Sequence, residues 1–229
     1  KKFNLHDLNI SKNAQIKHIR IQDRSENHSN INSINARINH QGKYVHHNFD
    51  FGGDITRNNV VTEILGEDAE VNLQGLFLGN KNQHIDNQTS IIHNIGPTKS
   101  TEEYRGIIGG KSKCIFNGKI YVAVGADGTD SSQSNHNLLL SESAEINTKP
   151  ELEIYAEDVK CAHGATIGEL DSAALFYLTT RGISKKNAKK ILTKAFAEKA
   201  ITNSDLNFCS DYLANRLEDQ LESIVGELQ

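Results

Sequence analysis

The segment Val71-Asn-Leu-Gln-Gly-Leu-Phe-Leu78 begins by alternating apolar with polar residues and lies between turn-forming residues. Two later segments, Cys114-Ile-Phe-Asn-Gly-Lys-Ile-Tyr-Val122 and Leu152-Glu-Ile-Tyr155, show related patterns. Alternation over about 4 to 8 positions is typical of β-strands, because successive side chains point to opposite faces. Up to about Thr166 such runs are separated by stretches rich in Asn, Gly, Asp and Ser. We therefore predict many short strands in this part of the chain.

A weak internal repeat relates some of these runs. Leu73-Gln-Gly75 and Phe116-Asn-Gly118 share an apolar-x-Gly pattern 43 residues apart, and Ala69-Glu-Val-Asn72 is related to Ala144-Glu-Ile-Asn147, 75 residues further on. An offset of 43 suits two coils of a β-solenoid with roughly 20-odd residues per coil. The 24 asparagines tolerate the left-handed corners that such coils need. The pattern favours a solenoid slightly over a β-sandwich, whose short strands look the same locally.

After Thr166 the apolar period changes to that of helices. Asp171 is placed to cap a first helix and Gly182 to end it, since such residues are preferred at these positions. Ser184 is placed to cap a second helix, in which apolar residues recur at i, i+3 and i+4. We therefore predict a small helical region after the strands.

A third helix is predicted to begin at Ser204 or Asp205. Its apolar residues form a nearly continuous stripe, made of Leu206, Cys209, Leu213, Leu217, Leu221, Ile224 and Leu228. Such a short helical region must dock on something. The pattern leaves two options nearly equal, the chain's own strands or another protein.

Composition excludes several classes of protein. The 229 residues carry a net charge of −4 and a sequence pI near 6.2, which gives no electrostatic reason to expect nucleic acid. No apolar run approaches the ~20 residues that span a bilayer, and no secretory leader pattern opens the chain. Cys114, Cys161 and Cys209 include no C-x-x-C pair, which argues against disulfides and structural zinc. We predict a soluble, cytoplasmic protein; an initial lysine and the absence of methionine suggest a fragment.

Val159-Lys-Cys-Ala-His-Gly-Ala-Thr166 is the segment richest in reactive side chains. If it is a strand, Cys161 and His163 lie on the same face. A thiolate and an imidazole together can ligate iron or zinc, or they can form a nucleophile–base pair. The pair alone nevertheless favours a buried thiol and a structural histidine, which are the commoner roles of these residues.

Two other groups are weaker candidates. His84, Asp86 and His93 lie in neighbouring segments and could ligate a metal, although hydrogen bonding to the backbone is the better interpretation. Glu151 and Glu153 share a face if they lie on a strand. They could serve a β-helix polysaccharide lyase or hydrolase that uses paired carboxylates, although such residues are usually just solvated.

Seven longer motifs occur in order between about residues 60 and 200. They are Leu73-Gln-Gly-Leu-Phe-Leu-Gly79, Gln83-His-Ile-Asp-Asn-Gln-Thr-Ser-Ile-Ile-His93, Phe116-Asn-Gly-Lys-Ile-Tyr-Val122, Asn137-Leu-Leu-Leu-Ser141, Asn147-Thr-Lys-Pro-Glu-Leu-Glu-Ile-Tyr-Ala156, Val159-Lys-Cys-Ala-His-Gly-Ala-Thr166 and Leu175-Phe-Tyr-Leu-Thr-Thr-Arg-Gly-Ile183. Together they resemble the SufB/SufD family, and their number and order make the resemblance specific.

The resemblance implies a mainly β fold, with a right-handed parallel β-helix over residues 1–166 and a C-terminal helical domain over residues 167–229. The family's N-terminal helical region is expected to be absent. The resemblance also implies a non-catalytic scaffold subunit of the SufBCD complex, which assembles iron–sulfur clusters. Its expected partners are SufB, through the β-helix, and the SufC ATPase, through the C-terminal helices. In isolation the chain is expected to form a homodimer or a monomer, without nucleic acid or membrane.

The motifs resemble the SufD branch rather than the SufB branch. SufB chains carry a cysteine where this chain has Pro150, and an acidic residue where it has Gly164. By resemblance, His163 matches a histidine proposed to face the SufB cysteine, and Cys161 is its neighbour. We therefore expect His163, with Cys161 beside it, to take part in a cluster-assembly site shared with SufB. His163 is the expected iron ligand, with iron or a cluster bound transiently at the interface and none held stably by the isolated chain.

Overall fold

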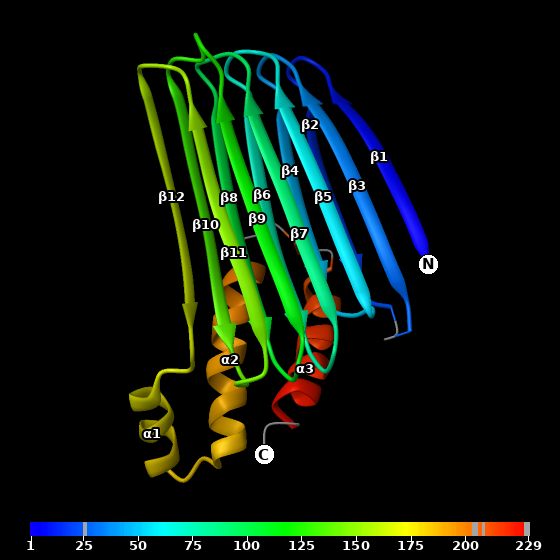
Figure 1. Cartoon of the computed structure of the whole chain (residues 1–229), viewed down its shortest axis with the longest axis vertical. Helices are drawn as coiled ribbons and strands as arrows, with labels where there is room; N and C mark the ends of the chain where they lie inside the picture. Colours follow the sequence, from blue (N-terminus) through cyan, green and yellow to red (C-terminus); the bar gives the residue numbers. More distant parts are fainter. Residues whose placement is uncertain (25–26, 203–205, 208, 227–229) are drawn as a thin grey trace.

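The computed structural model describes residues 1–24, 27–202, 206–207 and 209–226, and its strands form two parallel sheets of six (Figure 1). The odd sheet contains β1 (Lys2–Ile10), β3 (Ser29–Ile38), β5 (Ile55–Ile64), β7 (His84–His93), β9 (Lys113–Val122) and β11 (Glu145–Ile154). The even sheet contains β2 (Gln15–Gln22), β4 (Lys43–Asp50), β6 (Glu70–Gly79), β8 (Lys99–Ile108), β10 (Thr129–Leu139) and β12 (Val159–Gly168). Because successive strands alternate between the sheets, each coil contributes one strand to each. The fold is therefore a parallel β-solenoid of about six turns, as predicted, and not a sandwich of antiparallel sheets.

The coils are longer than the sequence repeat suggested. Ile55 pairs with His84 and His84 with Lys113, 29 residues apart each time, and the register offset of all paired strands lies between 26 and 32 residues. The prediction of 20-odd residues per coil is therefore wrong. The offset of 43 spans one and a half coils, which is why Gly75 lies in the even sheet and Gly118 in the odd sheet. The repeat unit that the sequence reveals is one strand with its turn, and two such units make a coil.

The two repeated glycines share a packing role. A Cβ atom on Gly75 would collide with the ring of Tyr104, and one on Gly118 would collide with the side-chain amide of Gln133. In both places a glycine in one strand makes room for a large side chain from another. A glycine within a strand commonly marks such a close approach.

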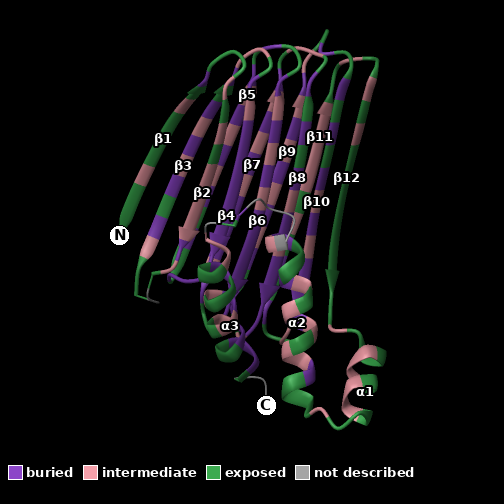
Figure 2. Ribbon diagram, turned by 180° about the vertical axis from the view of Figure 1, so that it is seen from behind, coloured by how far each residue is buried: buried purple, intermediate pink, exposed green. Residues whose placement is uncertain are grey.

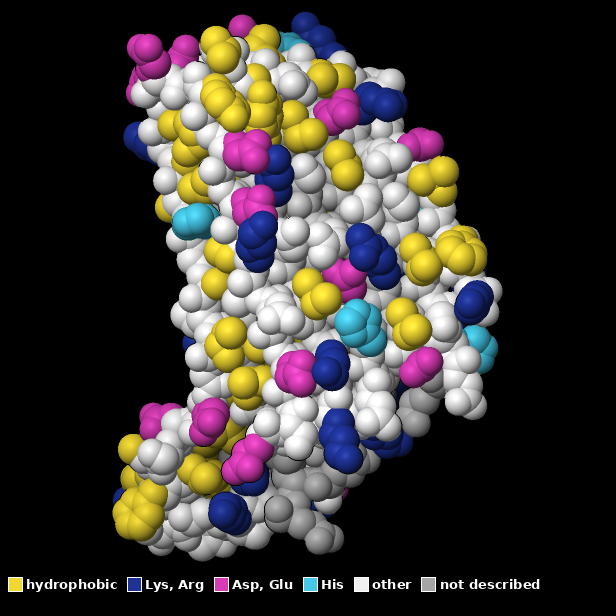
Figure 3. Space-filling view, viewed as in Figure 1, with side chains coloured by type: hydrophobic (Ala, Val, Ile, Leu, Met, Phe, Trp, Pro, Cys, Tyr) yellow, Lys and Arg dark blue, Asp and Glu magenta, His cyan; other side chains and the backbone are white. Residues whose placement is uncertain are grey.

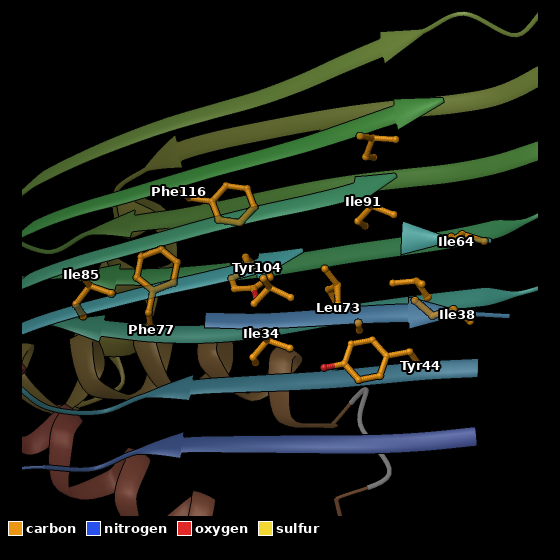
Figure 4. Packing of buried hydrophobic residues seen from close by; sticks show 14 of the residues in the cluster. Ile34, Ile38, Tyr44, Ile64, Leu73, Phe77, Ile85, Ile91, Tyr104 and Phe116 are labelled. Atoms are coloured by element: carbon orange, nitrogen blue, oxygen red, sulfur yellow. The ribbon is translucent and has the colours of Figure 1, made fainter. Parts of the chain in front are cut away.

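Apolar side chains from the inner faces of both sheets fill most of the solenoid (Figure 4). Leu73, Tyr104 and Phe116 are almost completely buried, and the ring centroids of Tyr104 and Phe116 lie 5.0 Å apart. Burial of this kind contributes roughly 25 cal/mol for each Å² of apolar surface removed from water.

The interior also holds polar groups near the first coils. The buried carboxylate of Asp50 accepts hydrogen bonds from Arg20 at 2.6 Å, from Asn48 at 2.8 Å and from Asn58 at 2.8 Å. Asn58 also donates to Asn87 on the next coil at 2.8 Å. These bonds connect β2, β4, β5 and β7 across the inside of the solenoid.

Three helices follow the strands, namely α1 (Ser172–Thr180), α2 (Lys185–Thr202) and α3 (Ser210–Gly226). The predicted caps of the first two are confirmed. Asp171 accepts a hydrogen bond from the backbone of Ala173 at 2.9 Å, Gly182 has φ +87°, and Ser184 accepts from the backbone of Asn187 at 3.3 Å. None of the described helices is long and apolar enough to cross a membrane.

The start of the third helix differs from the prediction. Ser204 and Asp205, the predicted first residues, lie outside the described residues, as does Leu228 at the end of the stripe. Within the described part, α3 begins at Ser210, so Leu206 and Cys209 precede the helix. The division into domains at residues 166 and 167 stays a prediction, with β12 ending at Gly168 and α1 beginning at Ser172.

Helices α2 and α3 cover part of the outer face of the even sheet (Figure 2). The buried stripe of α3 packs against apolar residues of β4, β6 and β8 and against the residue that follows β4. The helix contributes Leu213, Leu217, Leu221 and Ile224, and the sheet contributes Phe49, Phe51, Leu76, Leu78 and Ile107. Arg216 also pairs with Asp23, which follows β2. The structure therefore decides between the two options left by the sequence, because the stripe docks on the chain's own strands. By contrast, none of the residues of α1 is buried, and Phe176 and Tyr177 are exposed.

Candidate functional site

Cys161 and His163 lie on β12, the last strand of the even sheet. Val159 and Cys161 pack against the apolar interior. Because side chains alternate along a strand, His163 lies on the same inner face. β12 pairs with β10 along one edge, and among the described residues no strand pairs with its other edge. His163 is exposed, so its imidazole lies on the last coil, beside an open strand edge.

The two side chains differ in accessibility and in chemistry. Cys161 is half-buried, and burial, followed by the nearby charge of Asp130, raises the pKa of its thiol. The thiol therefore keeps its proton at neutral pH, which disfavours both metal binding and nucleophilic attack. Neutral imidazole binds iron without that penalty. His163 is the better ligand of the two.

Two buried polar residues lie behind His163 in the same ladder of strands. His163 is in register with Gln133 on β10, and Gln133 is in register with Glu102 on β8. Gln133 Nε2 donates a hydrogen bond to Glu102 Oε2 at 2.5 Å. Burial raises the pKa of Glu102 to about 7, because desolvation penalises the charged form.

The other strand of the last coil is β11, which carries Pro150. Pro150 is in register with Gly118 on β9. It is half-buried on the inner face, two positions from Thr148, which donates a hydrogen bond to Asn135 on β10 at 2.8 Å. Proline supplies no metal ligand, so on the inner face of this coil the candidate donors come from β12.

The structure separates the histidines of the first weaker candidate. His93 faces the interior, where its ring nitrogens lie 2.7 Å from Thr98 Oγ1 and 2.9 Å from Ser100 Oγ, and burial lowers its pKa to about 4. His84 and Asp86 lie on the opposite face of β7, where Asp86 pairs with Arg57 at 2.6 Å. His93 and Asp86 therefore have partners within the chain, and His84 lies on the face opposite to His93. Within the described ranges, no group of three or more His, Cys, Asp or Glu side chains is placed to hold a metal ion.

Glu151 and Glu153 lie on the outer face of the odd sheet, where acidic and basic side chains are interspersed (Figure 3). Glu151 pairs with Lys149, and Glu153 pairs with Lys119 at 2.8 Å. The hydrogen bond from Lys149 lowers the pKa of Glu151, whereas a general acid for glycoside cleavage needs a raised pKa. Glu151 therefore lacks the raised pKa that the general acid of a hydrolase needs.

Comparison with known proteins identifies the family of the chain. A family model described as "SUF system FeS cluster assembly, SufBD core domain" matches residues 3–196. The chain belongs to the SufB/SufD family. The family resemblance read from the sequence is thus confirmed.

The relatives include one protein named SufD and several named only as members of the SufBD family. The chain is 36% identical over 190 residues to the iron–sulfur cluster assembly protein SufD of Escherichia coli, covering 83% of this chain and 45% of that protein. It is 32% identical over 191 residues to a SufBD family protein of Synechocystis, covering 83% and 42%. It is 26% identical over 217 residues to a SufBD family protein of Mycobacterium tuberculosis, covering 91% and 55%. The chain spans about half the length of the curated relatives it matches.

Sequence reasoning did not single out Glu102 or Gln133. Their positions carry a usable pattern, because residues 102, 133 and 163 are separated by 31 and 30 positions, which is one coil each time. A coil length of 20-odd residues does not align them. The correct period would have placed both polar residues behind His163.

Proposed function

We propose that this chain is a non-catalytic scaffold and interface subunit for iron–sulfur cluster assembly. In this role His163 helps to hold iron or a nascent cluster, as cargo, between this chain and a second family member. The observation that carries the proposal is the exposed imidazole of His163 on the last coil, beside the open edge of β12. The named role of the relatives in cluster assembly supports it.

The ligand set supports a shared site. On the inner face of β12, His163 is an accessible donor and Cys161 is a half-buried donor. A cluster needs more ligands than these two, so the others would come from the partner. Cys161 would serve as a reserve ligand, since its thiol has to lose a proton first.

SufB is the proposed partner, joined through the β-helix. An open strand edge presents unpaired backbone N–H and C=O groups, which another chain can satisfy by adding a strand. The open edge of β12 lies next to His163, so such pairing would bring the partner's ligands to the site. In the absence of SufB, the same edge would allow a homodimer. The proposed compartment is the cytoplasm.

The test of the site uses His163→Ala in the assembled complex. We expect a large loss of iron and sulfide per complex with unchanged subunit assembly, because the exposed side chain supports no packing. His136→Ala is the matched control, since His136 lies on the neighbouring β10 strand and faces outward. Normal iron and sulfide content in the His163 variant would refute the site.

The SufC ATPase is the second proposed partner, docked through the C-terminal helices. Deleting residues 170–229 would uncover the apolar outer face of the even sheet, so point changes test this proposal better. Phe176 is 70% exposed and Tyr177 58% exposed on α1. We expect Phe176→Ala with Tyr177→Ala to weaken SufC binding while the chain stays folded. Val124→Ala is the control, because Val124 is 81% exposed away from the helices. Undiminished SufC binding by the α1 variant would contradict this docking site.

A further inference from the structure

Gln133 has one satisfied and one unsatisfied end. Its side chain is buried, with 3% exposed, and its Nε2 donates to Glu102 at 2.5 Å. Its Oε1 is buried and has no hydrogen-bond partner among the residues that the structure describes. A buried acceptor without a partner costs about 1–3 kcal/mol. Such an atom therefore indicates a donor that completes the arrangement.

His163 is the register partner of Gln133 on the next strand. Neighbouring strands lie about 4.8 Å apart, and in-register side chains on one face lie beside each other. An imidazole ring carries an N–H that can donate to an amide oxygen. The two side chains share no hydrogen bond in the part of the chain that the structure describes, so the exposed His163 side chain would have to rotate to reach Gln133 Oε1.

The opposite wall, at Gly118, fixes where the amide nitrogen of Gln133 lies. A Cβ on Gly118 would lie 2.1 Å from Gln133 Nε2 and 3.0 Å from Glu102 Oε2. The amide and the carboxyl group therefore fill the space that the glycine leaves. Because Nε2 is held against the carboxyl oxygen of Glu102, the remaining polar atom of Gln133 is its amide oxygen, Oε1. This oxygen can only accept a hydrogen bond, so its partner must be a donor.

We propose that Glu102 and Gln133 form a buried hydrogen-bonded relay that positions His163. Gln133 Oε1 accepts one ring N–H, and the other ring nitrogen keeps its lone pair for iron. Residues behind a metal-binding histidine commonly fix its tautomer and orientation in this way. Glu102 and Gln133 are positioning residues, since neither touches the cargo. The hydrogen bond stands on geometry, and its purpose rests on the function proposed for His163.

The direct test is the tautomer of His163, measured by nitrogen NMR on the ¹⁵N-histidine-labelled chain, with the signal assigned by its loss in His163→Ala. We expect one predominant tautomer in the unmodified chain and a redistribution in Gln133→Leu. Glu102→Gln should keep the tautomer, because an amide oxygen still accepts from Gln133. Ser132→Ala should keep it too, since Ser132 is exposed on the other face of β10. An unchanged tautomer in Gln133→Leu would overturn the relay.

A second measurement separates the relay from the function. In the complex, Gln133→Leu should lower the affinity for iron about 10- to 100-fold while assembly is retained. If Gln133→Leu fails to fold, the double variant Glu102→Leu with Gln133→Leu gives an apolar interior and is used for both measurements. If His163→Ala leaves iron content normal, the proposed function fails and the tautomer result still decides the hydrogen bond. If His163→Ala lowers iron content but the Gln133 variants do not, the relay is wrong.

Discussion

Two carboxylates that face the interior of the solenoid, Asp50 and Glu102, are in opposite electrostatic situations. Asp50, in the early coils, pairs with Arg20 at 2.6 Å and accepts two further hydrogen bonds from asparagines. Glu102, in the later coils, has no cationic partner among the described residues and accepts a hydrogen bond from the neutral amide of Gln133. The interior therefore neutralises the first carboxylate with a charge, whereas it leaves the second with a pKa of about 7.

This difference shows that polar residues inside a solenoid need not share a role. The network around Asp50 joins four successive coils, from Arg20 on β2 to Asn87 on β7. It begins at the end of the solenoid opposite to β12 (Figure 1). The pair of Glu102 and Gln133 ends at an unsatisfied oxygen, one strand away from an exposed histidine. The first arrangement connects neighbouring coils, whereas the second is the one that we propose to position His163.

The largest effect on the free energy of unfolding is expected from Asp50→Ala. The change leaves Arg20, whose side chain is 11% exposed, without its anion inside the solenoid. Breaking a buried ion pair from one side costs about 3–5 kcal/mol, and urea unfolding followed by circular dichroism measures it. Replacing both partners, with Arg20→Met and Asp50→Leu, should recover most of the loss. A stability close to the unmodified chain in Asp50→Ala would show that the pair does not stabilise the coils.

A smaller effect on the free energy of unfolding, with a defined pH dependence, is expected from Glu102→Gln. The pKa of Glu102 is raised from 4.5 to about 7 in the folded chain, so the folded state binds this proton more tightly than the unfolded state. The carboxyl group therefore reduces the stability as pH rises from about 4.5, and the loss levels off above pH 7. A pKa raised from 4.5 to about 7 corresponds to about 3 kcal/mol of lost stability above pH 7.

The measurement compares the unfolding free energies of Glu102→Gln and the unmodified chain at pH 4 and pH 8. We expect similar values at pH 4 and a variant more stable by about 3 kcal/mol at pH 8. Glu103→Gln is the control, because Glu103 lies on the outer face of β8 and pairs with Arg105 at 2.7 Å. A difference independent of pH would show that Glu102 ionises normally in the folded chain.

The two carboxylates also mark the limit of what the sequence predicts. Alternating runs and their glycines predict the strands, and the change of period after Thr166 predicts the helices and their caps. The coil length could not be obtained from two repeats, because one strand with its turn resembles the next and an offset of one and a half coils looks like a whole number of coils. Without the register, Glu102 and Gln133 are merely polar residues in two unrelated strands.

The candidate site was predictable to a similar extent. Cys161 and His163 were singled out from their spacing on a strand, and the family resemblance singled out His163. Their difference in accessibility, and the unsatisfied oxygen of Gln133, depend on β12 being the last strand of its sheet. That position is a property of the assembled coils and not of the local pattern.

The smallest effect is expected from a third kind of carboxylate, on the outer face of the odd sheet. Glu151 and Glu153 pair there with Lys149 and Lys119 on exposed strands, and exposed ion pairs contribute little because water and salt screen them. We expect Glu151→Gln with Glu153→Gln to unfold at the same urea concentration as the unmodified chain, within repeat error, and to leave the iron content of the complex unchanged. A marked loss of stability would mean that these surface pairs hold the last coil in place, whereas the loss of a glycan-cleaving activity would revive the enzyme interpretation. With the expected result, the proposed iron-binding residue of the last coil remains His163, on the inner face.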